Sequence, residues 1–330
     1  MRKEIRVSRL ISVKEHIEHL QIEKWLIDIG DVLEFDLFES IPYSTKKELF
    51  LSKRHPINIA LKNKIDHVEH LYIQRSDVLL YEQFIRDAIQ SIAQNAHISI
   101  TKKAAVIYHE ASVVVDELFD NPEALENVPK SKKVVNNFIS TIFSDTRAIE
   151  SLMKIASYDY YTQTHSINVC VYSLSLGSYL KLEEKVLAEL GTAALLHDLG
   201  KSKVNNEITN KKGRLTTAEF EQMKLHPSYG YEIALKIGIK DPRILDGIRH
   251  HHEKLDGSGY PDRIKGKNIT LFARIISICD VFDALSTKRS YKEKLGSYAA
   301  LQLMKDTMKQ HLDITFIDAF IRMQQHTQTI

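Results

Sequence analysis

The chain contains 330 residues, of which 45 are Lys or Arg and 43 are Asp or Glu, so its formal net charge is +2. At roughly 150 residues per domain, this length predicts about two domains. The 43% hydrophobic content and the small net charge argue against intrinsic disorder. Positive and negative residues are interspersed without a basic stripe, which argues against polymeric nucleic acid as the partner.

The cellular compartment is predicted from the cysteines and the apolar runs. Two cysteines, Cys170 and Cys279, are too few for a disulfide framework and form no CxxC zinc pattern. No apolar run reaches the ~18 residues of a membrane span. The opening residues MRKEIRVSRL contain no hydrophobic signal core. We therefore expect a soluble, reduced, cytoplasmic protein without a membrane span.

The first eighty residues combine short apolar runs with polar breaks. Pro42 and Pro56 lie between three runs of strand-like composition, at residues 5–11, 32–41 and 70–81. This pattern predicts a small α+β domain over residues 1–80. From its position in the chain, we expect it to be a regulatory or dimerising domain, through which a homodimer or a signalling-protein partner would form.

The next seventy residues, 81–150, are predicted to be a helical linker region. From Tyr81 to about Leu118, apolar residues recur at three- and four-residue spacing, which is typical of amphipathic helices. Residues 121–133 contain two prolines and a basic cluster, and they predict a surface connection.

Beyond the linker, nearly every segment has a helical pattern. Asp241 followed by Pro242 marks a helix start, with Asp as the N-cap and Pro in the first turn. Thr216 followed by Glu219 fits a capping box. The predicted fold class is therefore mainly α, with an all-α domain over residues 151–330 preceded by the small α+β domain and the helical linker.

Carboxylates interrupt two of the most apolar helical segments. His197 and Asp198 close the run AALLHDLGK, and Asp280 lies inside the apolar segment 271–285, with Asp283 three residues later on the same face. A buried carboxylate is costly unless it is paired or bound to a metal. Asp198 and Asp280 therefore point to a cation, whereas Asp283 could simply accept a hydrogen bond from a helix neighbour.

Further imidazoles lie on or beside predicted helices, at His165, His226, His251 and His252. Neutral imidazole together with carboxylate favours Fe, Mn, Ni or Zn over Ca or Mg. His250, the remaining member of the HHH run, is expected to be solvated beside two ligands. Cys279 is better explained as a small buried side chain than as a ligand.

Two motifs carry a family resemblance. HDLGK at 197–201 and HHEKLDGSGYP at 251–261 resemble the HD-GYP phosphodiesterases, a branch of the HD metal-dependent phosphohydrolases. Flanking blocks occur in the family's order, at residues 165–169, 210–227 and 274–292. The resemblance covers about residues 150–310 and implies the all-α HD-GYP helical domain.

The resemblance also implies a set of site residues. The family's metal ligands fall on His165, His197, Asp198, His226, His251, His252 and Asp280. Asp198 would bridge two metals and act in catalysis together with Lys201. The family's phosphate-binding residues fall on Lys201, Arg289 and Lys292, and Tyr260 falls at the lip of the site.

Family members hydrolyse cyclic di-GMP to the linear dinucleotide pGpG or on to GMP, and some act on related cyclic dinucleotides. The implied cofactors are two divalent metal ions, with iron first and manganese, nickel and zinc as alternatives, and a hydroxide bridging them is the expected nucleophile. Some members carry a Glu that supports a third metal, four residues before the first His. Here Tyr161 stands at that position, which implies a two-metal site.

Two alternatives to a cyclic di-GMP phosphodiesterase stay open. The first is a catalytically weak receptor that binds a cyclic dinucleotide or protein partners and signals by its shape. The second is an HD phosphohydrolase for another nucleotide, such as a dNTP or (p)ppGpp. The complete ligand set argues against the first, and the GYP block with Arg289 and Lys292 argues against the second.

Overall fold

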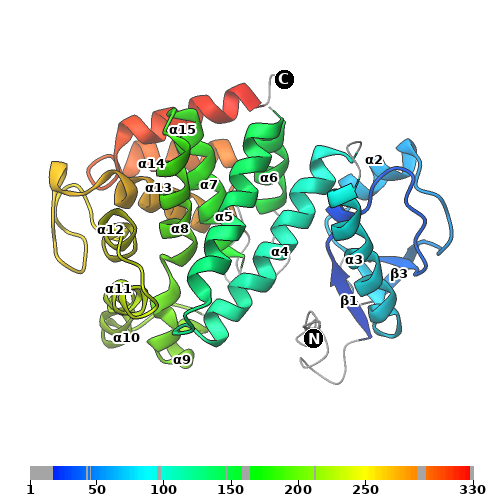
Figure 1. Cartoon of the computed structure of the whole chain (residues 1–330), viewed down its shortest axis with the longest axis horizontal. Coiled ribbons are helices and arrows are strands. Elements are labelled where there is room, and N and C mark those ends of the chain that lie inside the picture. Colours follow the sequence, from blue (N-terminus) through cyan, green and yellow to red (C-terminus); the bar gives the residue numbers. More distant parts are fainter. Residues whose placement is uncertain are drawn as a thin grey trace. The chain divides into compact units, whose positions relative to one another are not determined.

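The computed structural model describes residues 18–41, 44, 46–94, 98–145, 147–157, 164–211, 213–287 and 295–327 (Figure 1). The chain divides into two compact units, residues 1–106 and 107–330. The N-terminal unit contains strands and helices, and the C-terminal unit is helical throughout its described residues, so the predicted fold class is confirmed. No helix among the described residues is both long and apolar enough to cross a membrane.

The N-terminal unit is built on a four-stranded antiparallel sheet in the order β1-β4-β2-β3. The strands are β1 (His19–Ile22), β2 (Leu37–Ser40), β3 (Lys47–Leu51) and β4 (Leu71–Gln74), and the helices are α2 (Ile59–His67) and α3 (Val78–Gln94). Alternate residues of β1 are buried, as expected for a strand with one face on a core. Trp25 and Ile65 are buried in this core.

The strand prediction for this unit is partly wrong. Residues 70–81 form β4 only as far as Gln74, after which a 3₁₀ turn leads into α3. Val78, Tyr81 and Ile85 are buried, whereas Leu79 is exposed, so the apolar positions follow a helical period and not the strand period of two. The run 32–41 is a strand only over β2, and the run 5–11 lies outside the described residues.

The expected linker helices are α3 and α4 (Ile100–Asp120), followed by α5 (Asn127–Ser144) and α6 (Ala148–Ala156). The surface connection was predicted over residues 121–133, but it is shorter than predicted, because α5 begins at Asn127. Pro129 lies in the first turn of α5, where its missing N–H costs no hydrogen bond. Asn127 donates its side-chain amide to the carbonyl of Asn121 at 2.8 Å, which closes the short loop.

The remaining helices of the C-terminal unit include α7 (His165–Tyr179). The others are α8 (Glu184–Leu196), α9 (Asn206–Thr209), α10 (Thr217–Met223), α11 (His226–Lys236), α12 (Pro242–His250), α13 (Leu271–Ser286), α14 (Ser297–Thr307) and α15 (Ile314–Thr327). Helix α7 packs against α5, α6, α8, α13 and α15, whereas α9, α10 and α11 lie away from it (Figure 1). Every residue of α7 from Ser166 to Gly177 is buried, which is typical of a helix covered on all sides. Its neighbours α8 and α13 lead to or carry several of the candidate ligands.

Both predicted helix starts are confirmed. Asp241 accepts the backbone N–H of Arg243 at 2.9 Å at the start of α12. At the start of α10, Thr216 accepts the N–H of Glu219 at 3.3 Å while the Glu219 carboxylate accepts the N–H of Thr216 at 2.6 Å.

The capping box of α10 gives a stability prediction. Thr216→Ala should lower the free energy of unfolding by about 1 kcal/mol, because one orphan backbone N–H loses its acceptor. Thr216→Ser keeps the hydroxyl and should restore the wild-type value. Denaturant unfolding of the three proteins measures the difference, and equal midpoints for wild type and Thr216→Ala would show that the cap does not stabilise the helix.

Candidate metal centre

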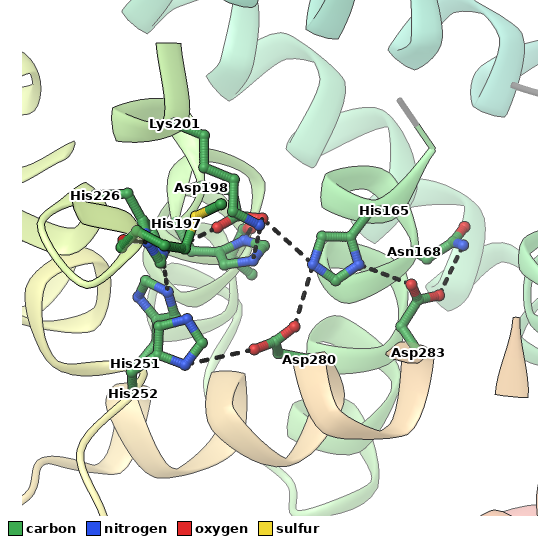
Figure 2. Close-up of polar contacts among 12 residues, drawn as sticks. His165, Asn168, His197, Asp198, Lys201, His226, His251, His252, Asp280 and Asp283 are labelled. Carbon is green, nitrogen blue, oxygen red and sulfur yellow. Dashed lines mark hydrogen bonds and ion pairs between the residues drawn. The ribbon is translucent and has the colours of Figure 1, made fainter. Parts of the chain in front are cut away.

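The seven residues that the sequence predicts as metal ligands lie together within the helical unit (Figure 2). Six of them lie beside helix ends: His165 begins α7, His197 and Asp198 follow α8, His226 begins α11, and two more follow α12. These two are His251 and His252, whereas Asp280 projects from the middle of α13. Residues at helix ends therefore provide most of the candidate ligands.

The ligand atoms fall into three overlapping groups within the described residues. They are His226, His251 and His252; His165, His197 and Asp280; and His197, Asp198 and His251, with the ligand atoms of each group within 4.8 Å of one another. Asp198 lies between the groups, because its Oδ1 is 3.2 Å from Nε2 of His226 and its Oδ2 is 3.4 Å from Nε2 of His165. Its two oxygens thus face imidazoles of different groups.

Local hydrogen bonds fix how the imidazoles are presented. His197, His226 and His251 each donate Nδ1–H to the backbone carbonyl three residues earlier, all at 2.7 Å. A carbonyl can only accept, so in each neutral ring the proton is on Nδ1 and the Nε2 lone pair points into the cluster. Metal-binding histidines are oriented by this kind of contact.

Several of the inward-facing atoms lack a hydrogen-bond partner, although Nε2 of His165 lies 3.1 Å from Oδ1 of Asp280. Nε2 of His226 lies 3.3 Å from Nε2 of His251, and neither atom carries a proton to donate when both rings are neutral. Among the described residues, Nε2 of His197 and Oδ1 of Asp198 are buried without a hydrogen-bond partner. Buried lone pairs that converge in this way are costly unless a cation is shared between them, so the residues fit divalent metal ions.

The protonation states of His251, His252 and Asp198 also suit metal binding. Burial lowers the pKa of His252 to about 3 and that of His251 well below its usual value, so both rings are neutral at pH 7. Burial opposes ionisation of Asp198, but the pKa of Asp198 lies well below its usual range, and the nearby charge of Lys201 is the largest contribution that lowers it. Neutral imidazoles and ionised carboxylates are the forms that ligate metals. His165 differs, because burial opposes its charge but Asp280 and Asp283 outweigh burial and raise the pKa of His165 to about 10, so this ring must lose a proton before it can ligate a metal.

Asp283 has a role that the sequence pattern did not reveal. It is 1% exposed, and its Oδ2 accepts Nδ1–H of His165 at 2.7 Å. Its Oδ1 accepts from Asn168 at 2.8 Å and from Thr287, a helix neighbour, at 2.9 Å. The hydroxyl of Tyr108 donates to Asn168 in turn. The hydrogen bond between Asp283 and His165 turns Nε2 of His165 toward the cluster (Figure 2). In the sequence, the only hint of this role was that Asp280 and Asp283 share one helix face.

We expect Asp283→Asn to weaken metal binding about 10- to 100-fold, as is typical when the acceptor behind a ligating histidine is lost. One oxygen of the carboxylate becomes an NH₂ group, which opposes the donor of either His165 or Asn168. Competition with a chromophoric chelator measures the affinity. Unchanged affinity in a folded Asp283→Asn protein would show that Asp283 does not orient the ligand.

Two of the residues that the sequence predicts to bind the substrate lie beside the cluster. Lys201 donates to Oδ2 of Asp198 at 2.5 Å, and its side chain is 35% exposed. The ring of Tyr260 lies against His252, with centroids 4.8 Å apart. Arg289 and Lys292 lie outside the described residues. The same is true of Tyr161, so the two-metal prediction drawn from that position stays a prediction.

His250 lies apart from the cluster but is not solvated as expected. Its Nδ1 contacts Asp246 at 2.7 Å and its Nε2 contacts Asp262 at 2.8 Å, with 14% of the side chain exposed. Glu253 is 2% exposed and accepts the N–H of Asp262 at 2.7 Å. These contacts hold the loop that carries Tyr260.

Comparisons with known proteins found a matching family model and related sequences. A family model described as an HD domain matches residues 142–316. A cyclic di-GMP phosphodiesterase of Pseudomonas aeruginosa is 32% identical over 67% of this chain and 54% of that protein. A 3′3′-cGAMP-specific phosphodiesterase of Vibrio cholerae is 32% identical over 74% of this chain and 53% of that protein. The chain therefore spans about half the length of these curated relatives.

A solved structure extends the likeness to the fold. An HDG"Y"P protein from Bdellovibrio bacteriovorus superposes with a TM-score of 0.64 at 20% identity, covering 93% of this chain and 100% of that chain. Because the HD-domain match includes more than half of the residues, the chain belongs to the HD-domain family. The resemblance predicted from the sequence is confirmed.

Proposed function

We propose that the protein is a metal-dependent phosphodiesterase that hydrolyses cyclic di-GMP to pGpG or on to GMP. The observation that carries this proposal is the convergence of the imidazole Nε2 atoms and the Asp198 oxygens in one buried cluster. The names of the two curated relatives support a cyclic dinucleotide as the substrate.

We assign the metal ions to two neighbouring positions that share Asp198, with iron as the first candidate and manganese, nickel and zinc as alternatives. The ligands are His165, His197, Asp198, His226, His251, His252 and Asp280. The placement of the two Asp198 oxygens, 3.2 Å from His226 and 3.4 Å from His165, supports a bridging role. Bound divalent ions would supply Lewis acidity and lower the pKa of water at the site.

The protein's own residues would bind and orient the substrate. Lys201 stands at the exposed side of Asp198 and can offset charge on a phosphoryl oxygen. Tyr260 borders His252 and would confine the sugar next to the scissile phosphate. Arg289 and Lys292 complete the proposed phosphate-binding set, since Arg can grip a phosphate in two places.

Residues 151–330 would carry catalysis, with 81–150 as the helical linker and 1–80 as a regulatory or dimerising domain. We place the protein in the cytoplasm, because Cys170 and Cys279 are free and buried, in keeping with a reducing compartment. Dimerisation or binding of a signalling partner through the N-terminal region belongs to the same proposal.

A substrate panel tests the proposal against its alternatives. Metal-loaded protein is incubated with cyclic di-GMP, 3′3′-cGAMP, a dNTP and ppGpp, and products are separated by chromatography. Hydrolysis of cyclic di-GMP to pGpG or GMP is the expected result. Turnover of the dNTP or ppGpp alone would indicate a different phosphohydrolase, and tight binding of cyclic di-GMP without turnover would indicate a receptor.

A further inference from the structure

Among the described residues, the exposed fraction of the cluster side chains differs from one part of the cluster to another, and it is 21% at His165 and 15% at Asp280. The side chains of His197 and His226 are 1% exposed, whereas those of His252 and Lys201 are 26% and 35% exposed. Of these residues, His252 and Lys201 are the most exposed, so they offer a substrate a route to the cluster. Side chains next to His252 and Lys201 would therefore contact the parts of the substrate that do not react.

A line of aromatic rings extends from His252. Tyr260 lies against His252, and Phe220 of α10 lies against Tyr260, with ring centroids 6.4 Å apart and an angle of 84° between the planes. Phe220 is 44% exposed, so much of its apolar ring faces solvent. An exposed aromatic ring beside a site for a nucleotide offers a stacking surface, because every base has a flat π-face.

A cation accompanies these rings. The ammonium of Lys224 lies 5.0 Å from the ring centroid of Phe220 and 6.0 Å from that of Tyr260. It pairs with Glu221 at 2.6 Å, and the side chains of Lys224 and Glu221 are 29% and 62% exposed. Such a partly exposed ion pair contributes little to stability, so Lys224 is free to turn toward a ligand.

We propose that Phe220 and Lys224 form a guanine-binding subsite, in which the base stacks on the Phe220 ring and Lys224 donates to the O6 and N7 acceptors of guanine. Adenine presents an amino donor where guanine presents O6, so Lys224 discriminates between the two purines. The subsite serves a cyclic dinucleotide whose phosphate lies at the metal cluster, and the inference therefore rests on the proposed function.

The stacking contact is tested by Phe220→Ala. We expect the KM for cyclic di-GMP to rise about tenfold with little change in kcat or metal content, since loss of one base-stacking contact has an effect of this size. Phe220→Trp should restore KM. Phe143→Ala, which truncates a phenylalanine that is 58% exposed on α5, is the matched control and should behave as wild type. An unchanged KM in Phe220→Ala would overturn the stacking contact.

The specificity contact is tested by Lys224→Met, which keeps the apolar stem and removes the donor. We expect the ratio of kcat/KM for cyclic di-GMP to that for cyclic di-AMP to fall about tenfold. Lys236→Met, at an exposed lysine paired with Glu123, is the control and should leave the ratio unchanged. An unchanged ratio in Lys224→Met would overturn the role of Lys224.

Failure of the inference can be distinguished from failure of the proposed function. If wild type hydrolyses cyclic di-GMP and Phe220→Ala has the same KM, the subsite is wrong and the function stands. If wild type hydrolyses no cyclic dinucleotide, the proposed function is wrong. Calorimetric binding of cyclic di-GMP to metal-loaded wild type and Phe220→Ala then decides the subsite, because equal affinities or no binding would overturn it.

Discussion

Replacement of Asp198 by Ala should remove bound metal and reduce phosphodiesterase turnover by about 10³-fold or more. The two oxygens of Asp198 face the imidazoles of His226 and His165, so both proposed metal positions lose a ligand at once. Metal ions supply several kcal/mol of transition-state stabilisation, and each ~1.4 kcal/mol corresponds to a factor of ten in rate. Metal content and initial rate are measured on the same preparation.

Asp318→Ala provides the matched control, since Asp318 is a surface carboxylate whose partner is Lys305, 2.8 Å away. It should keep full metal content and full turnover. An Asp198→Ala protein that is folded, binds the wild-type amount of metal and turns over at the wild-type rate would contradict the ligand assignment.

Gly200→Ala should disrupt the centre without touching a ligand. A Cβ atom on Gly200 would lie 1.9 Å from the carbonyl oxygen of His226 and 2.4 Å from the backbone nitrogen of Gly230. Both obstacles are backbone atoms, so α11 must shift, and His226 shifts with it. Overpacking of this kind costs about 1–3 kcal/mol or more. We expect a lower Tm together with a loss of metal affinity of at least about tenfold, as for a misplaced ligand.

The control for this substitution is Gly296→Ala, because a Cβ there meets no atom of the described residues within 4 Å. Thermal unfolding and metal titration are compared for the two variants and wild type. A Gly200→Ala protein with wild-type Tm and metal affinity would show that the close approach of Gly200 to α11 is not needed.

The helices of the C-terminal unit were largely predictable because their signals are local, and the candidate ligands that the structure brings together were expected from the family resemblance. Thr216 with Glu219, and Asp241 with Pro242, mark helix starts that depend on neighbouring residues only. Asp198 and Asp280 stand out because each interrupts an apolar segment. The N-terminal unit was less predictable, since its strands have only four or five residues and the apolar run at 70–81 contains both a strand and a helix start.

The contacts around the ligands could not be predicted, because they join residues far apart in the chain. Asp283 meets His165 across 118 positions, and Asn168 meets Asp283 across 115. A sequence pattern shows that such residues share a helix face, but not which side chain packs opposite. The contact between Phe220 and Tyr260 could not be predicted for the same reason, because it depends on how α10 packs near the 252–262 loop.

The most direct test of the proposed metal-dependent hydrolysis is turnover of cyclic di-GMP by protein purified without oxygen and loaded with Fe(II) or Mn(II), with metal counted in the same sample. We predict hydrolysis to pGpG or GMP with about two metal ions per chain, lost on chelation and restored when metal is added back. Two bound metals without hydrolysis of cyclic di-GMP would contradict the proposed activity.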